Sequence, residues 1–107
     1  SGVRPGDRLF LLRHGPEPRG IIGSAVAASA IYPEPHWRRE GGMANYLDLR
    51  WDAFVEPDAP LPLTVLKQEF PQQHWAPKGS GTEVKAPAVA ELEQLWSDHL
   101  RLTRRGR

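Results

Sequence analysis

The chain contains no cysteine, which excludes disulfide bonds and thiolate metal sites. This absence fits a reducing compartment, so we predict a cytoplasmic protein. No apolar run approaches the roughly 18 residues that a membrane span needs, and no membrane partner is expected. The most apolar stretch, residues 20–31, is too short for a span and follows no basic segment, so it is not a signal peptide.

The chain also lacks a large excess of positive or negative charge, since the net charge of its 107 residues is only +1. This balance argues against a basic body that coats DNA without specificity. The last seven residues are an exception, since they contain four arginines and no acid. We therefore predict one domain over residues 1–100 and a basic tail or linker over residues 101–107. The tail is either solvated or in contact with phosphates.

Proline and glycine, in contrast, are abundant, with eleven and ten residues. They divide the chain into short pieces, which favours strands and turns over long helices. Apolar runs predict strands at residues 8–14 and 20–31. Residues 32–43 are predicted to form a loop.

The second half of the chain has clearer periodicity. Residues 45–54 alternate as a half-buried strand, with Leu47, Leu49 and Trp51 on one face. A short helix is expected from Thr64, its N-cap, to Phe70, and a short strand at residues 82–85. The last helix begins at Pro87, and its core-facing residues recur at helical spacing: Val89, Leu92, Leu95, Trp96 and His99. These elements predict a small α+β domain.

Catalytic constellations are missing from the sequence. The histidines at 14, 36, 74 and 99 have no spacing typical of zinc ligands. Ser80 lies between two glycines, but the G-x-S-x-G spacing of a nucleophile elbow is absent. No phosphate-binding glycine loop is present. We predict no catalytic residue, no metal and no cofactor in this domain.

Four tryptophans remain to be explained. Trp96 on the last helix and Trp51 in the alternating strand are predicted to lie in the core. Trp37 and Trp75 occur in loops, where each either closes the core or forms the wall of a ligand site. A base stacked on such a wall gains roughly 1 to 3 kcal/mol. Extrusion of a base from a duplex requires a platform of this kind.

The end of the first predicted strand carries two polar residues, Arg13 and His14. They are either a surface cation and a packing histidine, or donors directed at a base edge or a phosphate.

Three segments in order, "PGDRLFLLRHGPEPRGIIGSA", "YLDLRWDAFVEPDAPLPLTVLK" and "HWAPKGSGTEV", followed by a closing helix, resemble a known family. The family is the N-terminal region of bacterial HNH-type restriction endonucleases, related to the EVE domain of the PUA superfamily. The match runs through nearly the whole chain. It implies a small, strongly bent β-barrel flanked by short helices.

The resemblance also implies a pocket for a flipped, modified base of double-stranded DNA, such as 5-methylcytosine or 5-hydroxymethylcytosine. Arg13, His74, Trp75, Ser80 and Gly81 carry over from the family motifs. The complete set of predicted pocket residues adds His14, Trp37 and Tyr46. Predicted phosphate contacts are Arg19, Arg38, Arg39 and Lys78.

The chain departs from the family at His14, where glutamine is favoured, and at Lys78-Gly79, where Gln-Ala or Gln-Ser occurs. The nuclease motif is not in these residues, so this domain is not predicted to be an enzyme. Cleavage by the whole protein, and a homodimer of it, are expectations that concern residues beyond Arg107. A first strand ahead of "PGDR" is also expected. The alternatives are an RNA-binding module of the same fold and a structural or protein-interaction domain without a pocket.

Overall fold

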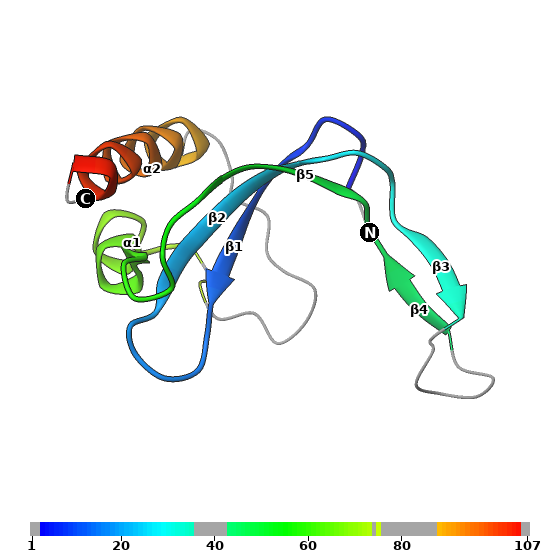
Figure 1. Cartoon of the computed structure of the whole chain (residues 1–107), viewed down its shortest axis with the longest axis horizontal. Helices are drawn as coiled ribbons and strands as arrows, with labels where there is room; N and C mark the ends of the chain where they lie inside the picture. Colours follow the sequence, from blue (N-terminus) through cyan, green and yellow to red (C-terminus); the bar gives the residue numbers. More distant parts are fainter. Residues whose placement is uncertain (1–2, 36–42, 74, 76–87, 106–107) are drawn as a thin grey trace. The chain divides into compact units, whose positions relative to one another are not determined.

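The computed structural model describes residues 3–35, 43–73, 75 and 88–105. In chain order the elements are β1 (Arg8–Arg13), β2 (Gly20–Ala27), β3 (Tyr32–Pro35), β4 (Met43–Tyr46), β5 (Leu49–Phe54), β6 (Leu61–Pro62), α1 (Leu63–Glu69) and α2 (Ala88–Arg105) (Figure 1). Together they form a small α+β domain with a four-stranded antiparallel sheet and two helices. No helix in this part of the chain is long and apolar enough to cross a membrane.

The sheet is open. Its strand order is β1-β2-β5, and β6 pairs with the start of β2. The first two residues of β2, Gly20 and Ile21, pair with β6, whereas Gly23 to Ala27 pair with β5. Over the described residues, β1 and β5 are not neighbours, so the predicted closed barrel is wrong for this sheet. Strand β2 is long and mostly buried because its glycines, alanines and isoleucines offer small or apolar surfaces on both faces.

The chain divides into two units, which are described separately. The first unit comprises Ser1–Leu11 and Gly23–Phe54 and contains the β2–β5 pairing. It also contains the hairpin of β3 and β4, in which Tyr32 lies opposite Tyr46. Residues 32–43 were predicted to be a loop, whereas residues 32–35 and residue 43 belong to these two strands, with prolines at 33 and 35. A two-stranded hairpin has open edges on both sides, and prolines are tolerated there because no ladder hydrogen bond is lost.

The predicted strand at 45–54 is two strands, separated at Leu47 and Asp48. The backbone at Asp48 forms a corner, because its N–H donates to Ser29 Oγ at 3.1 Å and its carbonyl accepts from the Ala28 N–H at 2.8 Å. The Tyr32 hydroxyl donates to Asp48 Oδ1 at 2.7 Å. The partners of Asp48 in these contacts lie 16 to 20 residues earlier in the chain. The alternation of residues 45–54 therefore does not reveal that the strand is interrupted at this point.

The second unit comprises Leu12–Ile22 and Val55–Arg107 and holds both helices. Helix α1 begins at Leu63 after Pro62, and no side chain caps it, so the predicted N-cap at Thr64 is wrong. The buried apolar residues of this unit come from β2, β6, both helices and the segments between elements: Ile21, Val55, Leu61, Leu66, Phe70, Trp75, Leu92 and Trp96. This set is the core of the unit.

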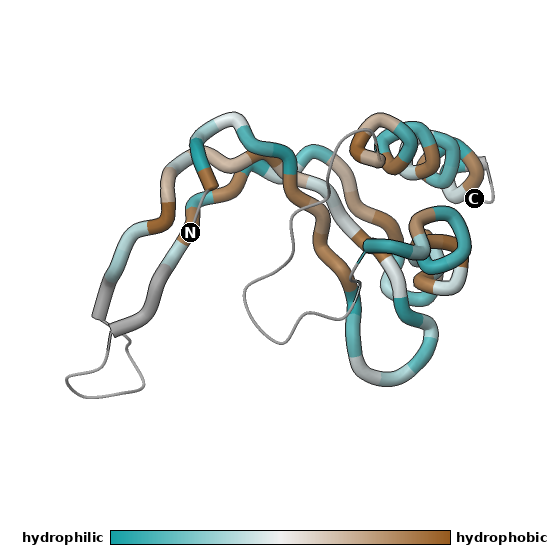
Figure 2. The backbone as a smooth tube through the Cα atoms, turned by 180° about the vertical axis from the view of Figure 1, so that it is seen from behind, coloured by the Kyte–Doolittle hydropathy of each residue, from teal (hydrophilic) through white to brown (hydrophobic). Residues whose placement is uncertain are grey.

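Helix α2 confirms the predicted helical periodicity. Trp96 and Leu92 are each only 1% exposed, as predicted for the core face. Hydrophobic and hydrophilic residues alternate along the helix in Figure 2, as expected for an amphipathic helix. The helix has 18 residues, so it is not short, and it continues to Arg105, past the boundary predicted at residue 101. Glu91 lies in its first turn, where an acid favours the helix dipole.

Candidate functional site

Five of the residues predicted from the sequence to form the site lie in the described part of the chain: Arg13, His14, Arg19, Tyr46 and Trp75. The other seven lie outside the described residues: Trp37, Arg38, Arg39, His74, Lys78, Ser80 and Gly81. The predicted strand at residues 82–85 also lies outside them.

Arg13 holds two loops of the second unit together. Its Nη1 donates to the carbonyl oxygen of Pro18 at 2.8 Å and to that of Pro57 at 2.9 Å. These bonds bring the β1–β2 loop and the β5–β6 loop to one side chain, which is half-buried. This nitrogen therefore donates to two carbonyl oxygens, so the geometry favours a structural role for Arg13 over a base-edge donor.

His14 and Arg19 are exposed in the same unit. Arg19 Nη2 lies 3.6 Å from Glu17 Oε2, an exposed ion pair of the kind that contributes little to stability. Nearby, a hollow of about 330 Å³ is lined by Glu17, Arg19, Asp58 and Lys67 among others. Acids and bases are mixed there, so its charge selects neither an anion nor a cation.

Trp75 is buried in the core of the second unit. Its side chain is 9% exposed, and its ring centroid lies 6.0 Å from that of Phe70. The indole Nε1–H donates to the Phe70 carbonyl oxygen at 3.3 Å. A buried indole with a satisfied N–H is what the core interpretation of this residue requires. This geometry favours the core over the wall of a base pocket.

Tyr46 belongs to the first unit, where it contacts Tyr32 across the β3–β4 hairpin with ring centroids 6.3 Å apart. The other four described residues of the predicted site belong to the second unit.

An exposed aromatic pair occurs instead on β5. The rings of Trp51 and Phe54 lie 4.9 Å apart, tilted by 37°, and are 40% and 59% exposed. The prediction that Trp51 belongs to the core is therefore wrong. Large apolar side chains this exposed are informative when they lie together, because isolated ones are ordinary.

A β-bulge brings these two rings to the same face. Residues three apart on a regular strand point to opposite faces of the sheet. Here Trp51 is paired with Ala25 and Ala53 with Ser24, so Asp52 is an extra residue on β5. Phe54 is paired with Gly23, which lies two residues from Ala25 and thus on the same face. Because of the bulge, Trp51 and Phe54 lie on the same face of the sheet although they are three residues apart.

Gly23 provides room for the Phe54 ring. A Cβ at this position would lie 3.1 Å from Cδ1 and 3.2 Å from Cε1 of Phe54, closer than ordinary contact. The ring therefore lies directly over the backbone of β2. A glycine within a strand is typical of close backbone approach, but nothing in the sequence connects Gly23 with Phe54.

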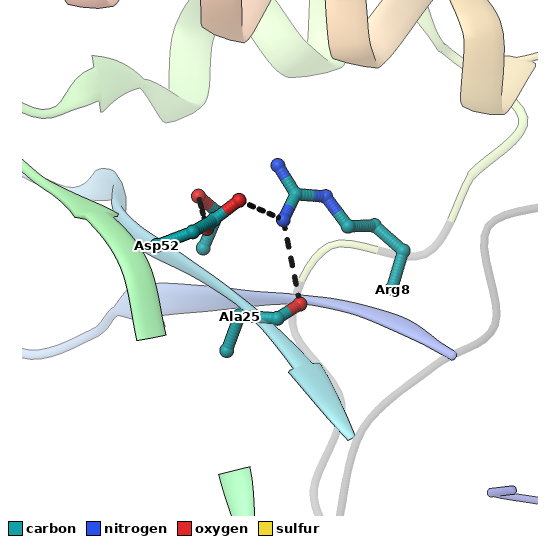
Figure 3. Close-up of polar contacts among 4 residues, drawn as sticks. Arg8, Ala25 and Asp52 are labelled. Atoms are coloured by element: carbon teal, nitrogen blue, oxygen red, sulfur yellow. Dashed lines mark hydrogen bonds and ion pairs between the residues drawn. The ribbon is translucent and has the colours of Figure 1, made fainter. Parts of the chain in front are cut away.

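A polar network surrounds Asp52 (Figure 3). Ser24 Oγ, which is fully buried, donates to Asp52 Oδ1 at 2.7 Å. Arg8 Nη1 donates to Asp52 Oδ2 at 2.7 Å and, at 3.5 Å, to the carbonyl oxygen of Ala25. The Arg8 guanidinium also lies 5.2 Å from the centre of the Phe10 ring. Three strands, β1, β2 and β5, thus contribute to this network.

The pKa of Asp52 is lowered below its ordinary value of 3.8. Partial burial would raise the pKa, but the hydrogen bonds from Ser24 and Arg8 and the charge of Arg8 outweigh it. A lowered folded-state pKa stabilises the fold at pH values above 3.8, and this stabilisation disappears as the pH falls through the folded pKa.

We expect the stability advantage of the wild type over Asp52→Asn to be constant near pH 6 and to shrink as the pH falls below 3.8. Urea unfolding at pH 6, 4.5 and 3 measures this difference. Asp58→Asn, which alters an exposed loop carboxylate, is the matched control. An Asp52→Asn difference that does not change with pH would contradict the ion pair.

No group of three or more His, Asp or Glu side chains that could hold a metal ion occurs among the residues described. Comparison with known protein families, curated proteins and solved structures gives no match for this chain. A functional proposal must therefore be based on the geometry of the described residues. Its most informative feature is the Trp51–Phe54 pair, which can offer two aromatic faces to a flat ligand.

Proposed function

We propose that this domain binds nucleic acid and that one base stacks on the exposed Trp51–Phe54 pair. The single observation that supports this is the exposure of two adjoining aromatic rings, 40% and 59%, on one face of the sheet. Apolar side chains normally gain free energy by burial, so exposing two of them together forgoes that gain. A stacked base recovers it, at about 1 to 3 kcal/mol per base.

The base that we propose is a modified cytosine of double-stranded DNA, 5-methylcytosine or 5-hydroxymethylcytosine, presented outside the helix. A methyl group adds apolar area to the stacked base, worth about 1 kcal/mol when it is buried. The preference over cytosine would therefore be roughly fivefold. The proposal includes a relationship to the EVE-related N-terminal regions of HNH endonucleases, although the sheet of this domain is open. For the whole protein it includes a modification-dependent HNH endonuclease in which this domain selects the site.

The test is binding of labelled duplexes that are identical except for 5-methylcytosine or cytosine at one position, at one fixed salt concentration. We expect the wild type to prefer the modified duplex. Trp51→Ala should weaken binding by about 1 to 3 kcal/mol, roughly 5- to 150-fold, because the stacking surface is lost. Fluorescence polarisation measures both quantities.

Leu102→Ala is the matched control, because Leu102 is also a large apolar residue and is 66% exposed, but on α2. Trp51→Phe should retain most of the affinity, since it keeps an aromatic face. If Trp51→Ala binds every duplex as tightly as the wild type, stacking on this pair is disproved. Tighter binding of RNA of the same sequence would favour the RNA-binding alternative.

A further inference from the structure

The aromatic pair depends on the one extra residue that β5 has between Trp51 and Phe54, the bulged Asp52. A bulged residue is left out of the regular ladder, so the backbone pairing alone fixes its position weakly. If the extra residue disappeared, or if the bulge moved out of the segment between Trp51 and Phe54, one of these two residues would turn to the other face of the sheet. Trp51 and Phe54 would then lie on opposite sides, because they are three residues apart.

The side chain of the bulged residue is anchored on both sides. Ser24 lies on β2, opposite Ala53, and its hydroxyl reaches Asp52 Oδ1 at 2.7 Å. Arg8 on β1 reaches Asp52 Oδ2 at 2.7 Å. Each carboxylate oxygen therefore has a donor from a different strand, and both strands would have to shift if the bulge moved.

The anchor and the aromatic pair face opposite sides of the sheet. Trp51 and Phe54 share the face of Ala25 and Gly23, whereas Ser24, between these two residues on β2, points to the other face. Asp52 meets Ser24 there, so it does not adjoin a base stacked on the pair. An effect of Asp52 on binding must then pass through the geometry of the rings.

We propose that Asp52, held by Ser24 and Arg8, is the positioning residue that keeps Trp51 and Phe54 on one face of the sheet. This inference rests on the proposed function for its effect on binding, but the ring geometry itself can be measured without a ligand. Asp52 makes no contact with the nucleic acid in this arrangement.

The first experiment uses nuclear Overhauser effects between the protons of the Trp51 indole and those of the Phe54 ring in the unliganded chain. At a centroid distance of 4.9 Å, the wild type should give clear cross-peaks. Asp52→Ala and Ser24→Ala should lose or weaken them, and Asp52→Asn should keep them in part, because the amide oxygen still accepts from Ser24. Asp58→Asn should leave them unchanged. Should Asp52→Ala fail to fold, Ser24→Ala and Asp52→Asn still decide the result.

The second experiment is a double-mutant cycle on duplex binding. Asp52→Ala should weaken binding by about fivefold or more, the lower end of one stacking contact. In the Trp51→Ala background, the same change should have no further effect, because a residue that acts through Trp51 cannot act without it. Equal losses in both backgrounds would overturn the positioning role.

The two experiments separate the inference from the proposed function. If Trp51→Ala has no effect on binding but Asp52→Ala abolishes the ring cross-peaks, the proposed function fails and the positioning role stands. If Trp51→Ala weakens binding while Asp52→Ala leaves both the cross-peaks and the affinity intact, the positioning role is overturned and the proposed function stands.

Discussion

Replacement of Gly20 by alanine should lower the free energy of unfolding by about 3 kcal/mol or more. An alanine Cβ would lie 2.0 Å from the carbonyl oxygen of Leu61 and 2.8 Å from its carbonyl carbon. Both atoms belong to the backbone of β6, which pairs with β2 at Gly20 and Ile21. A backbone carbonyl cannot rotate away as a side chain can, so β6 must separate from β2. The φ of Gly20, +155°, adds a further cost for any L-residue.

Urea unfolding followed by tryptophan fluorescence measures this loss, and Gly15→Ala is the matched control. Gly15 has a φ of +89° but nothing within 4 Å of the position of its Cβ, so only backbone strain is introduced. Its cost should be about 1 to 2 kcal/mol. If both variants lose the same free energy, the close approach of β2 and β6 is disproved.

Strands β1 and β2 and helix α2 could be predicted from the sequence because their signals are local. Residues 8–14 and 20–31 are apolar runs of strand length, and Leu92 and Trp96 recur at helical spacing. The hairpin of β3 and β4 was not predicted, since prolines usually argue against strands. The open sheet was missed for a different reason, because closure depends on which edge strands meet and no local pattern specifies that.

The aromatic pair could not be predicted, because it depends on one extra residue in the pairing of β5 with β2. Alternation over residues 45–54 predicts that Trp51 lies with Leu47 and Leu49 on one face, and if it continued regularly to Phe54 it would put that residue on the other face. The bulge at Asp52 reverses this assignment for Phe54. Its cause, the buried Ser24 hydroxyl and the Arg8 guanidinium, lies 28 and 44 residues away along the chain. A glycine on the neighbouring strand was the one available signal.

The sequence left two interpretations of Trp75 open, the core and the wall of a ligand site, because of its surroundings. One proline, one lysine and two glycines follow it within six residues, and such composition is typical of an exposed loop. Burial of this ring depends on Phe70, five residues earlier, which supplies both a ring contact and a carbonyl acceptor. Loop composition describes the backbone and does not determine where one large side chain lies.

Trp75→Ala should therefore cost about 3 to 5 kcal/mol of the free energy of unfolding, the loss typical of a buried aromatic residue. Trp51→Ala should cost only about 1 kcal/mol, since it removes an exposed contact between two aromatic rings of the same strand. Urea unfolding of the two variants under one set of conditions measures the contrast. Similar losses for both would contradict the burial difference of 9% against 40%.

A milder substitution separates the stability of the fold from ligand binding. Trp75→Phe keeps an aromatic ring in the core and loses the hydrogen bond to Phe70, which is worth about 1 kcal/mol. This variant should fold and bind the modified duplex with unchanged affinity, because stacking takes place on Trp51 and Phe54. If it folds as the wild type does and loses the preference for the modified base, the pocket belongs to the segment around Trp75. If Trp51→Ala alone loses binding, the base-binding site lies on β5. There a buried serine and an arginine hold the bulge that keeps the two rings on one face.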